Sequence, residues 1–128
     1  QYAVDVLQVK QVIVCGHYGC GGVRAALGHE ALGLIDNWLR ALKALYHQNL
    51  ERFKGLEQEA QVNLLCELNV QRQVRNVCHT TIVQNAWKRG QPLAVHGWIY
   101  GLTDGLVNDL DVTVSGADQL DDSFLYDQ

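Results

Sequence analysis

Residues 12–22 read VIVCGHYGCGG, a short apolar run that leads directly into a glycine-rich turn. The apolar run, residues 11–15 (QVIVC), is rich in β-branched side chains, which is typical of a strand buried on both faces of a parallel sheet. Residues 23–27 follow the turn with the composition of an opening helix. A strand, a tight turn and a helix in this order predict an α/β fold.

Two side chains in the turn are candidate metal ligands. His17 and Cys20 carry the imidazole nitrogen and thiolate sulfur that Zn²⁺ prefers, and a tight turn can bring both to one ion. A lone His-x-x-Cys pattern fits a packed cysteine and an exposed histidine equally well. A third interpretation makes Gly16, Gly19 and Gly22 an anion cradle. Their spacing matches neither G-x-G-x-x-G nor a P-loop, which argues against a nucleotide site.

The remaining cysteines and histidines show no ligand spacing. Cys15 ends the apolar run, and its side chain should alternate away from the turn, so we expect it in the core. The other residues are predicted to be core cysteines (Cys66, Cys78) and surface or helix-packing histidines (His29, His47, His79). No C-x-x-C occurs, which disfavours a thioredoxin-type site. Nothing marks secretion, so a disulfide framework is also disfavoured.

Outside the turn, periodicity predicts helices and one or two further strands. Apolar residues at helical spacing predict a helix with a broad apolar stripe (Leu34, Trp38, Leu42, Leu45). The other expected elements are the end of a helix at 2–9, a loop at 51–59, a helix at 64–74 that extends or restarts at 82–87, a strand at 93–100 and a turn at 104–105. Gly90 and Pro92 provide a helix stop. Residues 106–114 fit one more strand, or a short helix followed by a strand.

Composition limits the possible functions. The 128 residues are 48% hydrophobic, enough for one domain. Residues 1–103 carry 10 bases and 7 acids (+3), and residues 104–128 carry 7 Asp and no base (−7), which together give −4. With no basic stripe and no long apolar stretch, we expect neither nucleic-acid nor membrane binding. We expect a soluble, cytoplasmic protein. The chain lacks Met and starts at Gln1 within an apolar pattern, which suggests a fragment.

Five ordered motifs extend the pattern over nearly the whole chain: VIVCGHYGCGG (12–22), LGLIDNWL (32–39), CELNV (66–70), AWKRG (86–90) and VHGWIYG (95–101). The segments 104–106 and 109–111 fit the same series. Together these motifs resemble the β-class carbonic anhydrases, and most closely the bacterial members. The resemblance implies a mostly parallel β-sheet flanked by helices. It also implies that residues 1–128 are a single partial domain that lacks its N-terminal part.

The resemblance assigns a zinc site, with one Zn²⁺ per subunit held by two cysteines and a histidine. Its histidine and second cysteine correspond to His17 and Cys20. The first cysteine and the catalytic Asp/Arg pair lie in a C-x-D-x-R motif that this sequence lacks, so we expect no catalytic residue in this chain. The backbone of Gly21 and Gly22 is expected to contact substrate. Tyr100 aligns with a tyrosine that binds inhibitory bicarbonate in some members, although a packing role at an interface is the alternative.

The activity implied is the reversible hydration of carbon dioxide to bicarbonate and a proton by zinc-bound hydroxide. Its substrates are CO₂ and bicarbonate, and the resemblance implies a homodimer or homotetramer. We expect these residues alone to be inactive, because two protein ligands do not make a zinc site. The alternative is a catalytically degenerate homologue that acts as an assembly or anion-binding module.

Overall fold

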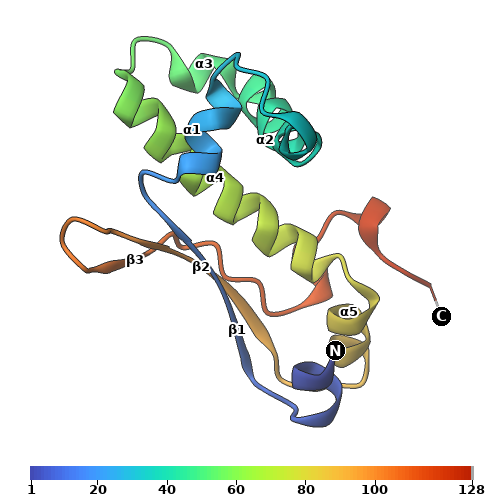
Figure 1. Ribbon diagram of the computed structural model, residues 1–128. Coiled ribbons are helices and arrows are strands. Elements are labelled where there is room, and N and C mark those ends of the chain that lie inside the picture. The colour runs from blue at the N-terminus through green and yellow to red at the C-terminus, as the bar shows by residue number, and fades with distance from the viewer. Residues whose placement is uncertain (128) are drawn as a thin grey trace. The chain divides into compact units, whose positions relative to one another are not determined.

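The structure, a computed structural model, describes residues 1–127, which divide into two compact units. Unit 1 holds Gln1–Cys15, Gln71–Trp98 and the chain from Asp109 on, and unit 2 holds Gly16–Val70 and Ile99–Asn108. Figure 1 shows the elements in order along the chain. The long helix and the first two strands contribute residues to both units.

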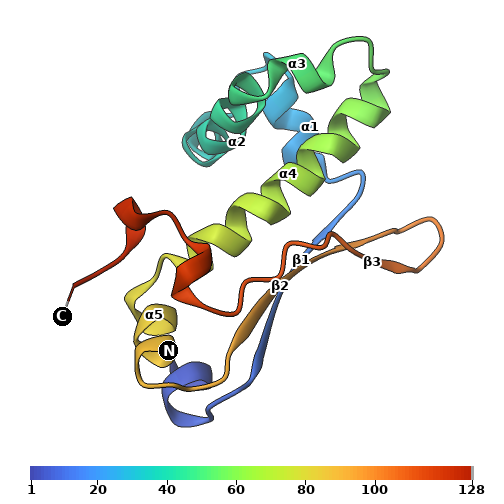
Figure 2. The same ribbon diagram turned by 180° about the vertical axis from the view of Figure 1, so that it is seen from behind.

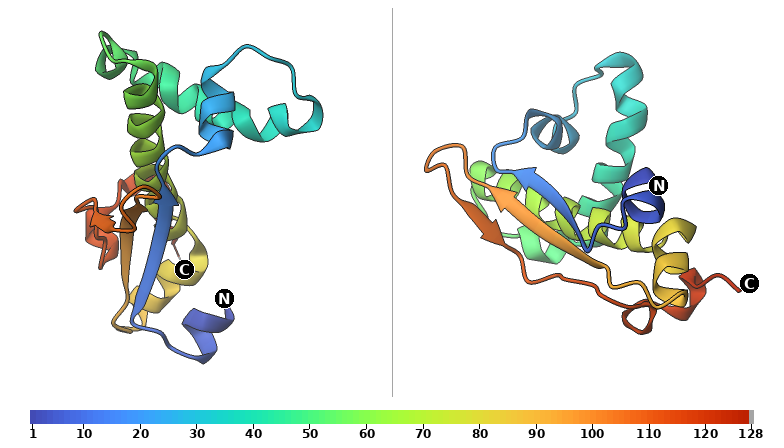
Figure 3. Two further views of the ribbon diagram at one scale, coloured as in Figure 1. Left: turned by 60° about the vertical axis from the view of Figure 1, so that its left-hand side comes forward. Right: turned by 90° about the horizontal axis from the view of Figure 1, so that it is seen from below.

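A small mixed sheet runs in the order β1-β2-β3. Its strands are β1 (Gln11–His17), β2 (Ala94–Tyr100) and β3 (Val107–Asp109). The N–H of Ala94 bonds the carbonyl of Lys10, and the N–H of Tyr18 bonds the carbonyl of Tyr100, so β1 and β2 run parallel. β3 runs antiparallel to β2, and the arrows in Figure 3 show both directions. The predicted α/β class is confirmed. Of residues 106–114, only Val107–Asp109 form a strand, Val114 makes a single antiparallel bridge with Val95, and the alternative short helix is not formed.

Strand β1 differs from its prediction. Its side chains alternate between exposed and half-buried, with Val12 and Val14 packed on the core of unit 1 and Ile13 45% exposed. Burial on both faces was therefore the wrong prediction, and so was a core position for Cys15, which is exposed. The reason is that, within residues 1–127, other parts of the chain pack on only one face of β1, the face that carries Val12 and Val14.

Unit 2 gathers short helices beside the first half of the long helix. They are α1 (Gly21–Leu27), η2 (Gly33–Ile35), α2 (Asp36–Gln48), α3 (Leu50–Phe53) and residues 58–70 of α4 (Gln58–Cys78). The Lys43 ammonium on α2 donates to the carbonyls of Ala26 (2.9 Å) and Gly28 (2.7 Å), which satisfies the C-terminal end of α1. Tyr46 and Phe53 pack edge to face with ring centroids 4.7 Å apart.

The apolar stripe predicted for residues 34–45 is only partly buried. Leu45 is buried as expected, but Leu34 and Trp38 are each 80% exposed. Leu39, which lies beside the predicted stripe, is 5% exposed. The helix is amphipathic as predicted, but the face packed within unit 2 is narrower than its apolar surface.

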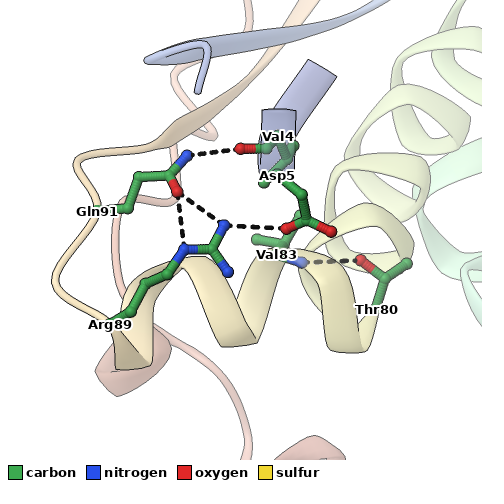
Figure 4. Close-up of polar contacts among 6 residues, drawn as sticks. All are labelled: Val4, Asp5, Thr80, Val83, Arg89 and Gln91. Atoms are coloured by element: carbon green, nitrogen blue, oxygen red, sulfur yellow. Dashed lines mark hydrogen bonds and ion pairs between the residues drawn. The ribbon is translucent and has the colours of Figure 1, made fainter. Parts of the chain in front are cut away.

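Unit 1 has one apolar core between helices and strands. The π-helical turn η1 (Tyr2–Val6) and the last turns of α4 lie with α5 (Thr81–Lys88) and with the C-terminal turns η3 (Ala117–Gln119) and η4 (Asp122–Phe124). The buried core residues are Val4, Val74, Cys78, Val83, Ala86, Leu93 and Val95. Figure 4 shows Arg89 donating to Asp5 (2.9 Å) and Gln91 donating to the carbonyl of Val4 (2.9 Å), which join η1 to the end of α5.

Gln84 is the one polar residue among the buried residues of the described chain, at 1% exposure. Its amide nitrogen donates to the carbonyl of Phe124 (2.8 Å), and its amide oxygen accepts from the N–H of Tyr126 (3.1 Å). Both ends of the side chain are therefore satisfied by the C-terminal segment, as burial of an amide requires.

A new helix, α5, begins after α4, and Thr80 caps its N-terminus. The Thr80 hydroxyl accepts from the N–H of Val83 at 3.4 Å (Figure 4). We expect Thr80→Ala to lower the free energy of unfolding by about 1 kcal/mol, since an unreplaced cap leaves a helix donor unpaired. Thr81→Ala, one residue inside the helix, is the matched control. Equal urea midpoints for the two variants would contradict the capping role.

Within residues 1–127, no helix has both the length and the apolar character needed to cross a bilayer. The longest helix, α4, has 21 residues but carries several charged ones.

Candidate metal centre

The turn between β1 and α1 places the two predicted ligands three residues apart at the end of the sheet. His17 is the last residue of β1 and is exposed, and Cys20 precedes the first turn of α1 and is half-buried. Gly19 between them has φ +66°, a left-handed conformation that costs other residues energy. Gly19 therefore lets the chain turn sharply between β1 and α1.

The ring of His17 is set for ligation through one nitrogen. Its Nδ1 lies 2.9 Å from the carbonyl oxygen of Tyr18. A carbonyl only accepts hydrogen bonds, so Nδ1 carries the proton and the Nε2 lone pair remains available. Metal-binding histidines commonly donate their other N–H in this way. The arrangement fits the predicted role of His17.

Cys66 lies close to Cys20 and is buried. Burial raises the pKa of the Cys66 thiol, and the backbone N–H groups of Cys20 and Gly19 offset part of that rise. Cys66 is 3% exposed, and a buried neutral thiol is a poor ligand. The prediction that Cys66 and Cys78 are core residues is confirmed, and none of the four cysteines of residues 1–127 forms a disulfide.

Helix α4 holds the turn through residues that the sequence interpretation did not single out. The Tyr18 hydroxyl donates to Glu67 at 2.6 Å, and the N–H of Gly19 donates to the side-chain oxygen of Asn63 at 3.2 Å. The bond to the Glu67 carboxylate, helped by burial, raises the pKa of Tyr18 to about 12. Tyr18 therefore stays protonated as a donor. The available signal was polar side chains at positions 63 and 67 within an apolar helical pattern.

The other predicted site residues lie in the same unit. Gly21 opens α1 and is exposed, and a Cβ on Gly22 would lie 3.9 Å from the Cys20 sulfur. Tyr100 ends β2, and its carbonyl accepts from Tyr18 at 3.0 Å. Its hydroxyl lies 3.7 Å from the position of a Cβ on Gly105. Substrate contact by the glycines and bicarbonate binding by Tyr100 stay predictions.

The donor set fits part of a zinc site. His17 and Cys20 have the right chemistry, and the hydrogen bond of His17 selects a suitable tautomer. No group of three His, Cys, Asp or Glu side chains in residues 1–127 is arranged to hold a metal ion. Zinc enzymes use at least three protein ligands. Zinc ligation by His17 and Cys20 therefore stays a prediction.

Residues 1–107 match the family model described as carbonic anhydrase. This chain belongs to the carbonic anhydrase family. A carbonic anhydrase of Emericella nidulans is 40% identical over 116 residues, which are 90% of this chain and 51% of that protein. Relatives also include cyanobacterial and bacterial carbonic anhydrases, such as one from Synechocystis at 32% identity over 84% of this chain and 40% of its own length.

Solved structures place the chain in the β class. The β-carbonic anhydrase of Coccomyxa, in complex with acetazolamide, superposes with a TM-score of 0.85 at 39% identity, covering 91% of this chain and 54% of that one. A structure from a study of two tetrameric β-carbonic anhydrases of Sordaria macrospora gives 0.81 at 28% identity, covering 89% and 58%. The β-carbonic anhydrase fold is confirmed. The chain spans about half the length of these carbonic anhydrases.

Proposed function

We propose that the protein containing this chain catalyses the reversible hydration of CO₂ to bicarbonate and a proton, and that this chain contributes two of its zinc ligands. The observation that carries the proposal is the turn itself: His17 presents Nε2 while Nδ1 is held by the Tyr18 carbonyl, and Cys20 follows three residues later. Family membership supports the reaction class. That the chain forms a single partial domain of the enzyme is part of the same proposal.

In this proposal the chain supplies and orients two zinc ligands. The other groups of the site come from outside the chain. His17 Nε2 and the Cys20 thiolate bind Zn²⁺, and a further cysteine completes the set. Zinc held by these ligands would lower the pKa of water to about 7 and so make hydroxide available at neutral pH. The backbone of Gly21 and Gly22, where a side chain is absent, lets CO₂ approach closely.

An oligomer and a second anion site belong to the same proposal. The β-carbonic anhydrases of Sordaria macrospora are described as tetrameric, which supports a homodimer or homotetramer here. Tyr100 is proposed to bind an inhibitory bicarbonate with residues from outside this chain. A cytoplasmic location remains a prediction.

The test is zinc content per chain together with CO₂ hydration by stopped flow, on the complete protein with its intact mass determined. One zinc per subunit and fast turnover are expected. The isolated residues 1–128, measured in parallel, should bind zinc substoichiometrically and show little turnover, since they supply two ligands. A complete protein with neither zinc nor turnover would overturn the proposal in favour of a degenerate homologue.

A further inference from the structure

One face of helix α4 lies against the turn that carries the two candidate ligands. Asn63, Cys66 and Glu67 stand at positions i, i+3 and i+4, so they project from the same side of the helix. All three belong to unit 2, as does the turn. Their neighbours Val62 and Leu65 are fully buried, which fixes the rotation of the helix that presents this face.

The three side chains reach successive residues of the turn. Glu67 accepts from the Tyr18 hydroxyl at 2.6 Å, and Asn63 accepts from the Gly19 N–H at 3.2 Å. The Cys66 thiol lies at the N–H groups of Gly19 and Cys20. Every residue between His17 and Cys20 therefore has a partner on one rigid helix.

Tyr18 connects this helix face to the His17 ring. Its N–H bonds the carbonyl of Tyr100 (3.0 Å), its hydroxyl bonds Glu67, and its carbonyl holds His17 Nδ1 at 2.9 Å. The Tyr18 carbonyl shares a peptide plane with the Gly19 N–H, which Asn63 holds at 3.2 Å, so this peptide cannot rotate freely. The acceptor that selects the histidine tautomer therefore stays in place.

We propose that Glu67 and Asn63 are positioning residues for zinc, which act through Tyr18 and Gly19 to hold His17 and Cys20 in a ligating arrangement before the metal binds. This inference rests on the proposed function. A turn held in advance loses less conformational freedom on binding, which strengthens affinity without any new contact to the ion. Residues that orient metal ligands are typically worth about 10–100-fold in affinity or activity.

The experiment uses the complete protein with Tyr18→Phe, Glu67→Leu, their double variant and Glu67→Gln. The first readout is the rate of zinc release to an excess chelator, and the second is the visible absorption spectrum of the Co²⁺-substituted protein. Tyr18→Phe and Glu67→Leu should each speed zinc release by about 10-fold or more. The double variant should release zinc no faster than the singles, because both remove the same hydrogen bond.

Two further variants separate positioning from general stability. Glu67→Gln keeps an acceptor oxygen and should restore slow zinc release and the wild-type Co²⁺ spectrum. Glu59→Gln is the matched control, because Glu59 also lies on α4 but pairs with Arg24 (2.6 Å) instead of the turn. It should leave both readouts unchanged even if the melting temperature falls.

Two outcomes would overturn the inference. One is slow release and an unchanged spectrum in Glu67→Leu, and the other is multiplicative effects in the double variant. The wild-type protein reports separately on the proposed function: absence of zinc there would end both proposals, whereas stoichiometric zinc with insensitive variants would end only this one.

Discussion

Replacing Cys20 with serine should remove stoichiometric zinc from the complete protein and lower CO₂ hydration by more than about 100-fold, beyond the range for residues that only orient ligands. Serine keeps the size of the side chain but replaces a soft thiolate with a hydroxyl that stays protonated at neutral pH. Zinc content by atomic absorption and stopped-flow hydration would measure the two effects. Since Cys20 is half-buried at the start of α1, the fold should survive the change.

The matched control is Cys15→Ser, which alters an exposed cysteine of β1 five residues earlier. We expect it to keep its zinc, because Cys15, although it lies on the same exposed face of β1 as His17, precedes the turn that carries the two predicted ligands. Retention of full zinc and activity by Cys20→Ser would remove this residue from the ligand set.

Gly16→Ala should lower the free energy of unfolding by about 1–3 kcal/mol, the usual cost of overpacking. A Cβ at this position would stand 2.6 Å from Cγ2 of Val70, which is 2% exposed and cannot swing away. The strain would fall on the residue before His17, so zinc affinity should fall as well. Urea denaturation and chelator competition would measure the two losses.

Val70→Ala removes the atom that the new methyl group meets, so the double variant should recover part of the stability that Gly16→Ala loses. Gly21→Ala is the control, because no atom lies within 4 Å of its Cβ position and alanine favours a helix. Additive losses in the double variant would show that the contact with Val70 is not the cause.

The fold was predictable where local sequence and packing agree. The turn, the helix that follows it, the helical segment at α5 and the alternating strand β2 all formed near their expected positions. The errors share one cause: apolar residues mark a surface that requires burial but do not say what buries it. Ile13 and Trp38 fit a covered strand and a covered helix, yet both are exposed within the described chain.

In the candidate site, the sequence predicted only those residues whose type alone suggests metal binding. His17 and Cys20 stand out as ligands because imidazole and thiol groups are uncommon and closely spaced. Glu67 does not, because a glutamate on a helix usually faces solvent, and its bond to Tyr18 spans 49 positions. Such a contact depends on how α4 packs on the turn, which no local pattern encodes.

The buried amide of Gln84 has a consequence for how this chain tolerates insertions and deletions. It pairs with the carbonyl of Phe124 and the N–H of Tyr126, as a neighbouring strand would. A single-residue insertion just before this segment would bring Leu125, whose N–H already bonds the Asp122 carbonyl, toward the position of Tyr126. An amide buried without its partner costs about 1–3 kcal/mol. Length changes should therefore be far better tolerated after residue 126 than between residues 112 and 124.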